Sequence, residues 1–242
     1  MVDATPRSSD TMGARVLCVF GSQTKSCERI MHKQLAARFK EVAARVDVFE
    51  GNEFVHEMED LQSIVKSYDV LVVCTSSFGD GDPPDNYNAF LLALQSGAEE
   101  GSKPLAGLQH AVLGEGSSIY RETFQNCPRL TDKYLEECGS RRLVARHETD
   151  VGGDEDEQIS RTLFRDATMA VLKAGLPAPS APPVAAWNKP RASHAEPKDQ
   201  IVLKTAAELG GGRQQTWAQI LVPATVAMVA VSTYVYTQYV ME

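Results

Sequence analysis

The 242-residue sequence lacks an excess of positive charge, closely spaced cysteines and an apolar segment near its start. Its net charge of −8 argues against nucleic acid as the main partner, because phosphate backbones are bound by basic surfaces. None of the five cysteines forms a C-x-x-C pair, which favours a reducing compartment over a disulfide framework. Residues 1–14 are polar, so we expect a disordered N-terminus without a secretory signal.

Signatures of metal and hydrolase sites are also missing. The five histidines are dispersed and show no metal-ligand spacing, so no metal site is expected. Ser117 and Ser118 are not part of a G-x-S-x-G nucleophile elbow, which argues against a hydrolase. No internal repeat recurs every 20–50 residues.

The pattern that is present alternates apolar runs with segments of helical periodicity. The runs predict five strands, at 16–20, 46–49, 70–74, 108–113 and 142–147. The helical segments lie at 27–42, 58–65, 87–94, 130–138 and 159–172. This alternation predicts one α/β domain over 15–175, with a doubly wound, five-stranded parallel sheet ordered 2-1-3-4-5.

Three loops follow the first, third and fourth predicted strands, at 21–26, 75–86 and 114–120. Their strand ends are neighbours in this order, where open α/β sheets bind ligands. Hydroxyls and backbone amides in the first loop suit a phosphate. Phe78 and Tyr120, in the other two, would suit the two faces of a flat ring. A plain strand-to-helix connection with Phe78 packed inward is the alternative interpretation.

These loops carry a family resemblance. GSQTKSCE resembles the GSQTGTAE phosphate loop of the diflavin reductases, which include NADPH–cytochrome reductases, sulfite reductase flavoproteins and methionine synthase reductase. TSSFGDGDPPDN resembles their second flavin loop nearly residue for residue. LGEGSSIYRETFQNCPRL and the helix after it resemble the third flavin loop. The resemblance covers about residues 15–174 and implies a flavodoxin-like, FMN-binding fold.

The resemblance also implies roles for particular residues. Ser22, Thr24 and Ser26 would hold the FMN phosphate, while Phe78 and Tyr120 would cover the isoalloxazine ring. No side chain is expected to be catalytic, because the cofactor supplies the chemistry. The full implied set is Ser22, Gln23, Thr24, Lys25, Ser26, Ser76, Ser77, Phe78, Gly79, Gly81, Gly114, Tyr120, Phe124, Asn126 and Asp150.

Two departures from the family pattern leave a second class of function open. Lys25 replaces a glycine, the residue that most readily adopts positive φ. The third loop counts six residues from Gly114 to Tyr120, longer than in the family, and the step from Tyr120 to Phe124 is one residue longer. A flavin-free structural or assembly subunit of a membrane complex is therefore the alternative to a flavoprotein.

The C-terminal third has a different character. Residues 176–215 are rich in proline and alanine, as in a semi-rigid linker. Residues 216–241 carry no charge and are bounded by Trp217 and Tyr239, which predicts a transmembrane helix serving as a tail anchor. Basic residues, among them Arg213, precede this span, so we expect the domain to be cytosolic. The absence of basic residues after the span favours the endoplasmic reticulum over the mitochondrial outer membrane.

The sequence thus predicts a membrane-anchored electron-transfer protein, an oxidoreductase component that binds FMN. No FAD or NADPH module is recognisable, so we expect single electrons to come from a separate NAD(P)H–FAD reductase. A haem or iron–sulfur protein would accept them, docking on the acidic face. A self-sufficient FMN quinone reductase that uses NAD(P)H directly is a further alternative.

Overall fold

The computed structural model describes residues 13–154 and 156–177. A parallel sheet runs through this part in the order β2-β1-β3-β4-β5, and β6 pairs with β4, which confirms the predicted order. The strands are β1 (Arg15–Phe20), β2 (Arg45–Glu50), β3 (Val70–Ser76), β4 (Gln109–Gly116), β5 (Arg141–Arg142) and β6 (His147–Asp150).

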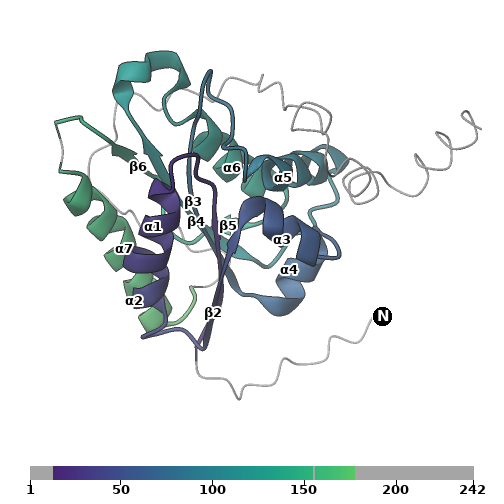
Figure 1. Cartoon of the computed structure of the whole chain (residues 1–242). Coiled ribbons are helices and arrows are strands. Elements are labelled where there is room, and N and C mark those ends of the chain that lie inside the picture. The colour runs from purple at the N-terminus through teal and green to yellow at the C-terminus, as the bar shows by residue number, and fades with distance from the viewer. Residues whose placement is uncertain (1–12, 155, 178–242) are drawn as a thin grey trace, which may run out of the picture. The chain divides into compact units, whose positions relative to one another are not determined.

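Helices cover both faces of the sheet (Figure 1). On one face lie α1 (Ser26–Ile30), α2 (Ala37–Phe39) and α7 (Glu157–Ala174), and a π-helical segment, Met31–Ala36, joins α1 to α2. On the other face lie α3 (Gly51–Glu57), α4 (Leu61–Ser67), α5 (Asn88–Glu100) and α6 (Asn126–Glu137). Covered on both sides, β1 and β3 are buried along nearly their whole length, which explains their unbroken apolar sequences.

The structure differs from the predicted elements in three places. The fifth strand, predicted at 142–147, is split into β5 and β6, and the regular pairing with β4 is interrupted between them. The predicted helix at 58–65 is replaced by α3 and α4, because Met58 is extended and Asp60 caps a new helix by accepting a hydrogen bond from Ser63 N. The strand β4 extends to Gly116 and takes in the start of the expected third loop.

The predicted disordered N-terminus, apart from residues 13 and 14, lies outside the described residues. The predicted linker beyond residue 177 and the predicted span at 216–241 also lie outside them. Among the residues that are described, no helix is both long and apolar enough to cross a membrane.

Candidate functional site

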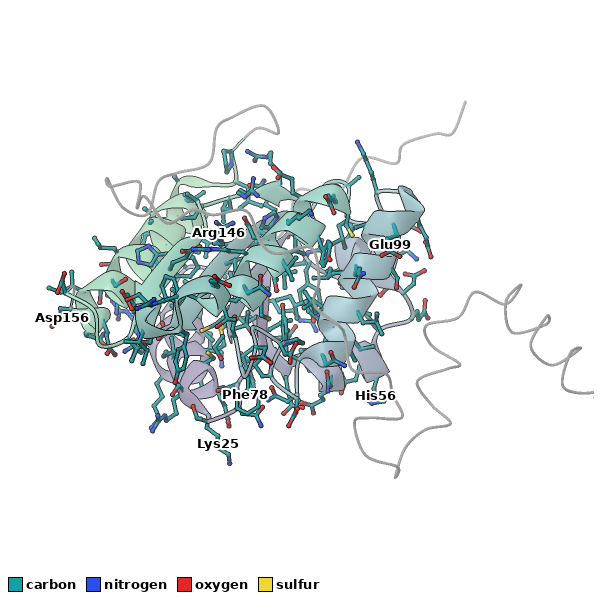
Figure 2. The ribbon with its side chains drawn as sticks, turned by 90° about the horizontal axis from the view of Figure 1, so that it is seen from above. Lys25, His56, Phe78, Glu99, Arg146 and Asp156 are labelled. Carbon is teal, nitrogen blue, oxygen red and sulfur yellow. The ribbon has the colours of Figure 1, made fainter. Side chains whose placement is uncertain are left out.

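The carboxyl ends of β1, β3 and β4 lie next to one another, so the three predicted loops meet at one edge of the sheet. Phe20 is in register with Cys74, and Ser76 with Glu115. Figure 2 views the domain from above; Lys25 and Phe78 lie toward the same margin.

The first loop, 21–25, presents hydrogen-bond donors in front of α1. Ser22 Oγ accepts a hydrogen bond from Cys27 N at 3.2 Å, and the hydroxyls of Thr24 and Ser26 are 3.3 Å apart. Within the described residues, the backbone amides from Gln23 to Ser26 have no protein acceptor. Unused amides and hydroxyls before a helix form the donor set that a phosphate requires.

Asn86 and Gln23 fasten this loop to the second one. Asn86 Oδ1 accepts from Ser22 N at 2.8 Å, and its Nδ2 donates to Glu50 Oε2 at 3.2 Å. Gln23 donates from Nε2 to the Asp85 carboxylate and accepts from Asp85 N, both at 3.1 Å. Sequence reasoning missed Asn86; its place after Pro-Pro-Asp, in a loop rich in turn residues, was the available signal.

The second loop is a tight turn that holds Phe78 outward. Phe78 and Asp82 exchange both backbone hydrogen bonds, at 2.8 and 2.9 Å. Gly79 and Gly81 within the turn have φ of 54° and 97°, which glycine adopts without strain. Asn126 Nδ2 donates to Gly81 O at 3.2 Å. Phe78 is 46% exposed, so the alternative in which it packs inward is wrong.

The third loop is anchored at its start and exposed at its tip. Ser118 N donates to Asp150 Oδ1 at 2.8 Å. Because β4 continues to Gly116, two of the six residues counted from Gly114 belong to the strand, and the loop itself is correspondingly shorter than predicted. Tyr120 is 64% exposed at its tip.

The extra residue between Tyr120 and Phe124 coincides with an unusual backbone conformation. Arg121 has φ 44° and ψ −99° inside the 3₁₀ segment Ser118–Thr123. Few residues other than glycine adopt such values. Phe124, after this turn, is buried again and lies 5.8 Å from the Arg129 guanidinium.

A cavity of about 310 Å³ lies between the second and third loops. Its volume is in the range of small-molecule sites, and the exposed Phe78 and Tyr120 are among its lining residues, as a flat ring would require. A Cβ on Gly116 would come within 3.3 Å of Gln125 and Phe124, so a side chain there would require these neighbours to shift slightly. The lining residues are Ser77, Phe78, Gly79, Gly116, Ser117, Tyr120, Thr123, Phe124 and Gln125.

Several predicted site residues lie outside this lining. Ser76 ends β3. Gly81 and Asn126 hold the second loop, and Asp150 holds the third. Gly114 is a packing position, because a Cβ there would collide with the Gln125 side chain. Gly116, Ser117, Thr123 and Gln125 were missed; their nearness to Phe124 and Gly114 in sequence was the only signal.

Glu115, at the same edge, contributes no open negative charge. It is 4% exposed, and Arg161 Nη2 on α7 donates to its Oε2 at 2.6 Å. Burial raises the pKa of Glu115, and the Arg161 contact opposes this shift. Exposed acidic residues on the second and third loops include Asp80, Asp85 and Glu122.

A buried charge network supports α6, the helix that follows the third loop. Asp132 accepts from His110 at 3.3 Å, from Arg142 at 2.9 Å and from Arg146 at 2.7 Å. Burial would raise the pKa of Asp132, but these hydrogen bonds outweigh burial and hold it well below the usual range. Arg146 also reaches Glu148 in β6, so α6 and the outer strands are tied together.

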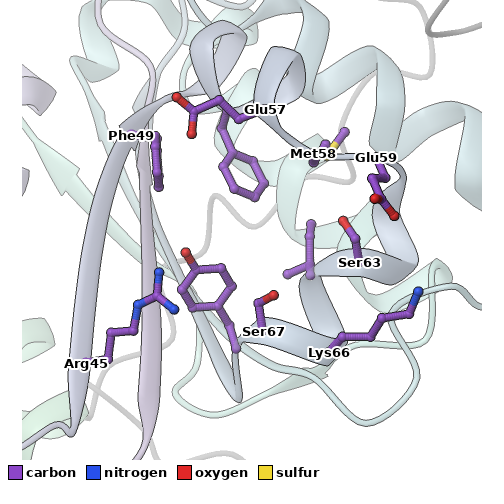
Figure 3. A pocket seen from close by; sticks show the side chains of 11 residues that line it. Arg45, Phe49, Glu57, Met58, Glu59, Ser63, Lys66 and Ser67 are labelled. Carbon is purple, nitrogen blue, oxygen red and sulfur yellow. The ribbon is translucent and has the colours of Figure 1, made fainter.

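A second cavity, of about 400 Å³, lies beside the edge strand β2, against α3 and α4 (Figure 3). Two of its lining residues contact one another, because the Arg45 guanidinium lies 5.3 Å from the Tyr68 ring, and Tyr68 OH donates to Asp47 at 2.8 Å. Burial, followed by the Asp47 hydrogen bond, raises the pKa of Tyr68 to about 12. We assign no ligand to this second cavity.

Comparisons with known proteins agree with this geometry. The chain is 31% identical over 172 residues to a bifunctional cytochrome P450/NADPH–P450 reductase of Bacillus cereus, covering 70% of this chain and 15% of that protein. It is 31% identical over 151 residues to the NADPH–cytochrome P450 reductase of Sus scrofa, covering 61% and 20%. The chain therefore spans about a fifth or less of these relatives.

A flavodoxin from Pseudomonas aeruginosa, solved as a cysteine-to-serine mutant, shares the fold, with a TM-score of 0.51 at 19% identity over 66% of this chain and 99% of that chain. The flavodoxin family matches residues 18–163, which is more than half of the sequence. The chain therefore belongs to the flavodoxin family and carries an FMN-type electron-transfer domain related to that of the P450 reductases.

Proposed function

We propose that this protein is a membrane-tethered carrier of single electrons, with FMN held between Phe78 and Tyr120. The observation that carries the proposal is the aromatic-lined cavity at the same sheet edge as the donor-rich first loop. Bound FMN supplies the redox chemistry, so the protein has only to hold and orient the cofactor. Ser22, Thr24 and Ser26 would hold its phosphate.

The exposure of the two aromatic residues bears on how electrons would enter and leave. Phe78 and Tyr120 are both about half exposed or more, so a ring between them would be accessible to a docked protein. Asp80 and Asp85 give the surrounding surface negative charge. Such a surface favours fast association with a basic partner.

We propose a haem or iron–sulfur protein as the acceptor, in line with relatives named as cytochrome P450 reductases. The matched region covers a fifth or less of those reductases. As the electron donor we propose an NAD(P)H-oxidising, FAD-containing reductase.

We further propose that residues 216–241 anchor the domain on the cytosolic side of a membrane, with the endoplasmic reticulum favoured. Pro177, the last described residue, accepts hydrogen bonds from Gln109 Nε2 at 3.4 Å and Arg141 Nη2 at 3.1 Å. Both donors lie at the amino ends of their strands, opposite the flavin loops. Release of the full chain from membranes by alkaline carbonate would contradict this proposal.

A flavin titration tests the central proposal. The full-length chain, purified in detergent, should quench FMN fluorescence, because stacking against Phe78 and Tyr120 brings the ring onto aromatic faces. Riboflavin with bovine albumin serves as the control for non-specific quenching. Absence of saturable quenching would contradict the carrier hypothesis.

That negative result would favour the second candidate, a flavodoxin fold kept as a structural subunit. The strained backbone of Lys25 and Arg121, in two of the three loops, is the observation in its favour.

If FMN binds, mixing the FMN-loaded protein with NADPH alone tests the alternative of a self-sufficient quinone reductase. Rapid bleaching without a second protein would support direct use of NADPH.

A further inference from the structure

Lys25 is the residue of the first loop that the family resemblance does not explain. Its backbone has φ 62° and ψ 14°, the left-handed conformation that glycine adopts freely and a lysine adopts at a cost. The loop therefore has, at Lys25, a backbone conformation that suits a glycine better than a lysine. A strained residue persists where something else compensates for the strain.

The charge of Lys25 offers that compensation. The side chain is exposed and extends outward from the ribbon (Figure 2). Within the described residues, no carboxylate pairs with its ammonium group. The carboxylate of Asp85 in the second loop accepts a hydrogen bond from Gln23. Lys25 is thus an available cation between the hydroxyl-bearing residues Thr24 and Ser26, in a chain of net charge −8.

We propose that Lys25 recognises the terminal phosphate of the flavin and makes the site select the phosphate monoester over its dephosphorylated form. This inference rests on the proposed FMN function and deepens it. A phosphate monoester carries about −1.5 to −2 charges at pH 7. A cation beside unused amides strengthens hydrogen bonds to such a dianion and offsets repulsion from the acidic surface.

Three substitutions separate the effect of the Lys25 charge from the effect of its strained backbone. Lys25→Gly removes both, Lys25→Asn removes the charge while tolerating the left-handed conformation, and Lys25→Arg keeps both. Lys33→Gln, on the exposed surface of the following helical segment, is the matched control for charge alone.

The experiment measures dissociation constants for FMN and riboflavin with the full-length protein at low and high salt. At low salt, Lys25→Gly and Lys25→Asn should each bind FMN about tenfold more weakly than the wild type, and riboflavin equally well. The difference should shrink at 1 M salt, where charges are screened within about 3 Å. Lys25→Arg and Lys33→Gln should match the wild type.

Two outcomes overturn the inference: unchanged or tighter FMN binding by Lys25→Gly, or an equal loss for riboflavin. Thermal unfolding with inorganic phosphate as the probe separates this failure from failure of the proposed function. Phosphate should raise the melting temperature of the wild type more than that of Lys25→Gly. If phosphate stabilises the wild type more than Lys25→Gly while no flavin binds, the carrier function is contradicted and Lys25 remains a phosphate-binding residue. If neither phosphate nor flavin binds, both the carrier function and the role of Lys25 are contradicted.

Discussion

The two ends of the candidate site are held in different ways. At the phosphate end, the first loop is fastened through Asn86 to Glu50 and through Gln23 to Asp85. At the ring end, the third loop is fastened through Ser118 to Asp150, and beyond that contact Tyr120 is 64% exposed. One end is preorganised, while the tip of the other is free to adjust.

This difference indicates where the binding free energy of a flavin should come from. Donors held in place before binding lose little conformational entropy when a ligand arrives. An exposed aromatic residue on a loop tip loses more, so its stacking contributes less on balance. The phosphate end should dominate affinity, and the ring end should adapt to the ring and to a docked partner.

The largest expected effect tests the buried charge network that supports α6, the helix that follows the third loop. Asp132→Asn leaves Arg142, Arg146 and His110 facing an uncharged group in a buried network, which should destabilise the fold by about 3–5 kcal/mol. Urea unfolding at pH 7 measures it. Replacing the exposed Asp166 by asparagine is the matched control and should change little.

The pH dependence of this effect has a definite sign. The folded-state pKa of Asp132 is lowered, so its stabilisation is present above the unfolded pKa, about 4, and is lost as the pH falls toward the folded value. The gap between wild type and Asp132→Asn should therefore be full at pH 7 and shrink below pH 4. A gap independent of pH down to pH 2 would show that the charge of Asp132 is not responsible.

The next effect tests the phosphate end. Asn86→Ala removes one hydrogen bond to Ser22 N and one to Glu50, which should cost about 2 kcal/mol of stability. It also frees the first loop, so FMN affinity should fall by about tenfold or more. Gln95→Ala, on the exposed side of α5, is the control. Normal FMN affinity in a destabilised Asn86→Ala protein would remove the argument for a preorganised phosphate end.

A smaller effect separates the two aromatic walls. Phe78→Ala should weaken FMN binding by about 1 kcal/mol, and Tyr120→Ala by less, because the Phe78–Asp82 turn is ordered by two backbone hydrogen bonds. Fluorescence titration measures both, with Ile119→Ala as the control for an exposed loop side chain. A larger loss for Tyr120→Ala would reverse the comparison between the two loops.

Much of this arrangement was predictable from the sequence, for identifiable reasons. Apolar runs at β1 and β3 report burial on both faces, and strand order then places the three loops together. Phe78 stood out as the one large apolar residue in a glycine-rich loop. These are local signals that depend on residues close in the sequence.

What the sequence did not predict depends on contacts between distant residues. Asn86 braces Ser22 across 64 positions, and Gln125 lies over Gly114 only because α6 packs against β4. Next to the interruption of the fifth strand, Arg146 donates to both Asp132 and Glu148. None of these pairings leaves a periodic pattern in the sequence.

The smallest expected effect concerns the extra residue of the third loop. Arg121 has φ 44° and ψ −99°, which costs about 1–3 kcal/mol in a residue with a Cβ. Arg121→Gly should relieve this strain, and after the entropy that glycine loses on folding the net gain should be about 0.5 kcal/mol. The measurement is thermal unfolding of the flavin-free protein. Ser118→Gly, in the same segment but without positive φ, should lose stability. If both substitutions destabilise the protein equally, the backbone of Arg121 is not strained in solution. The adaptability of the ring end then does not depend on Arg121.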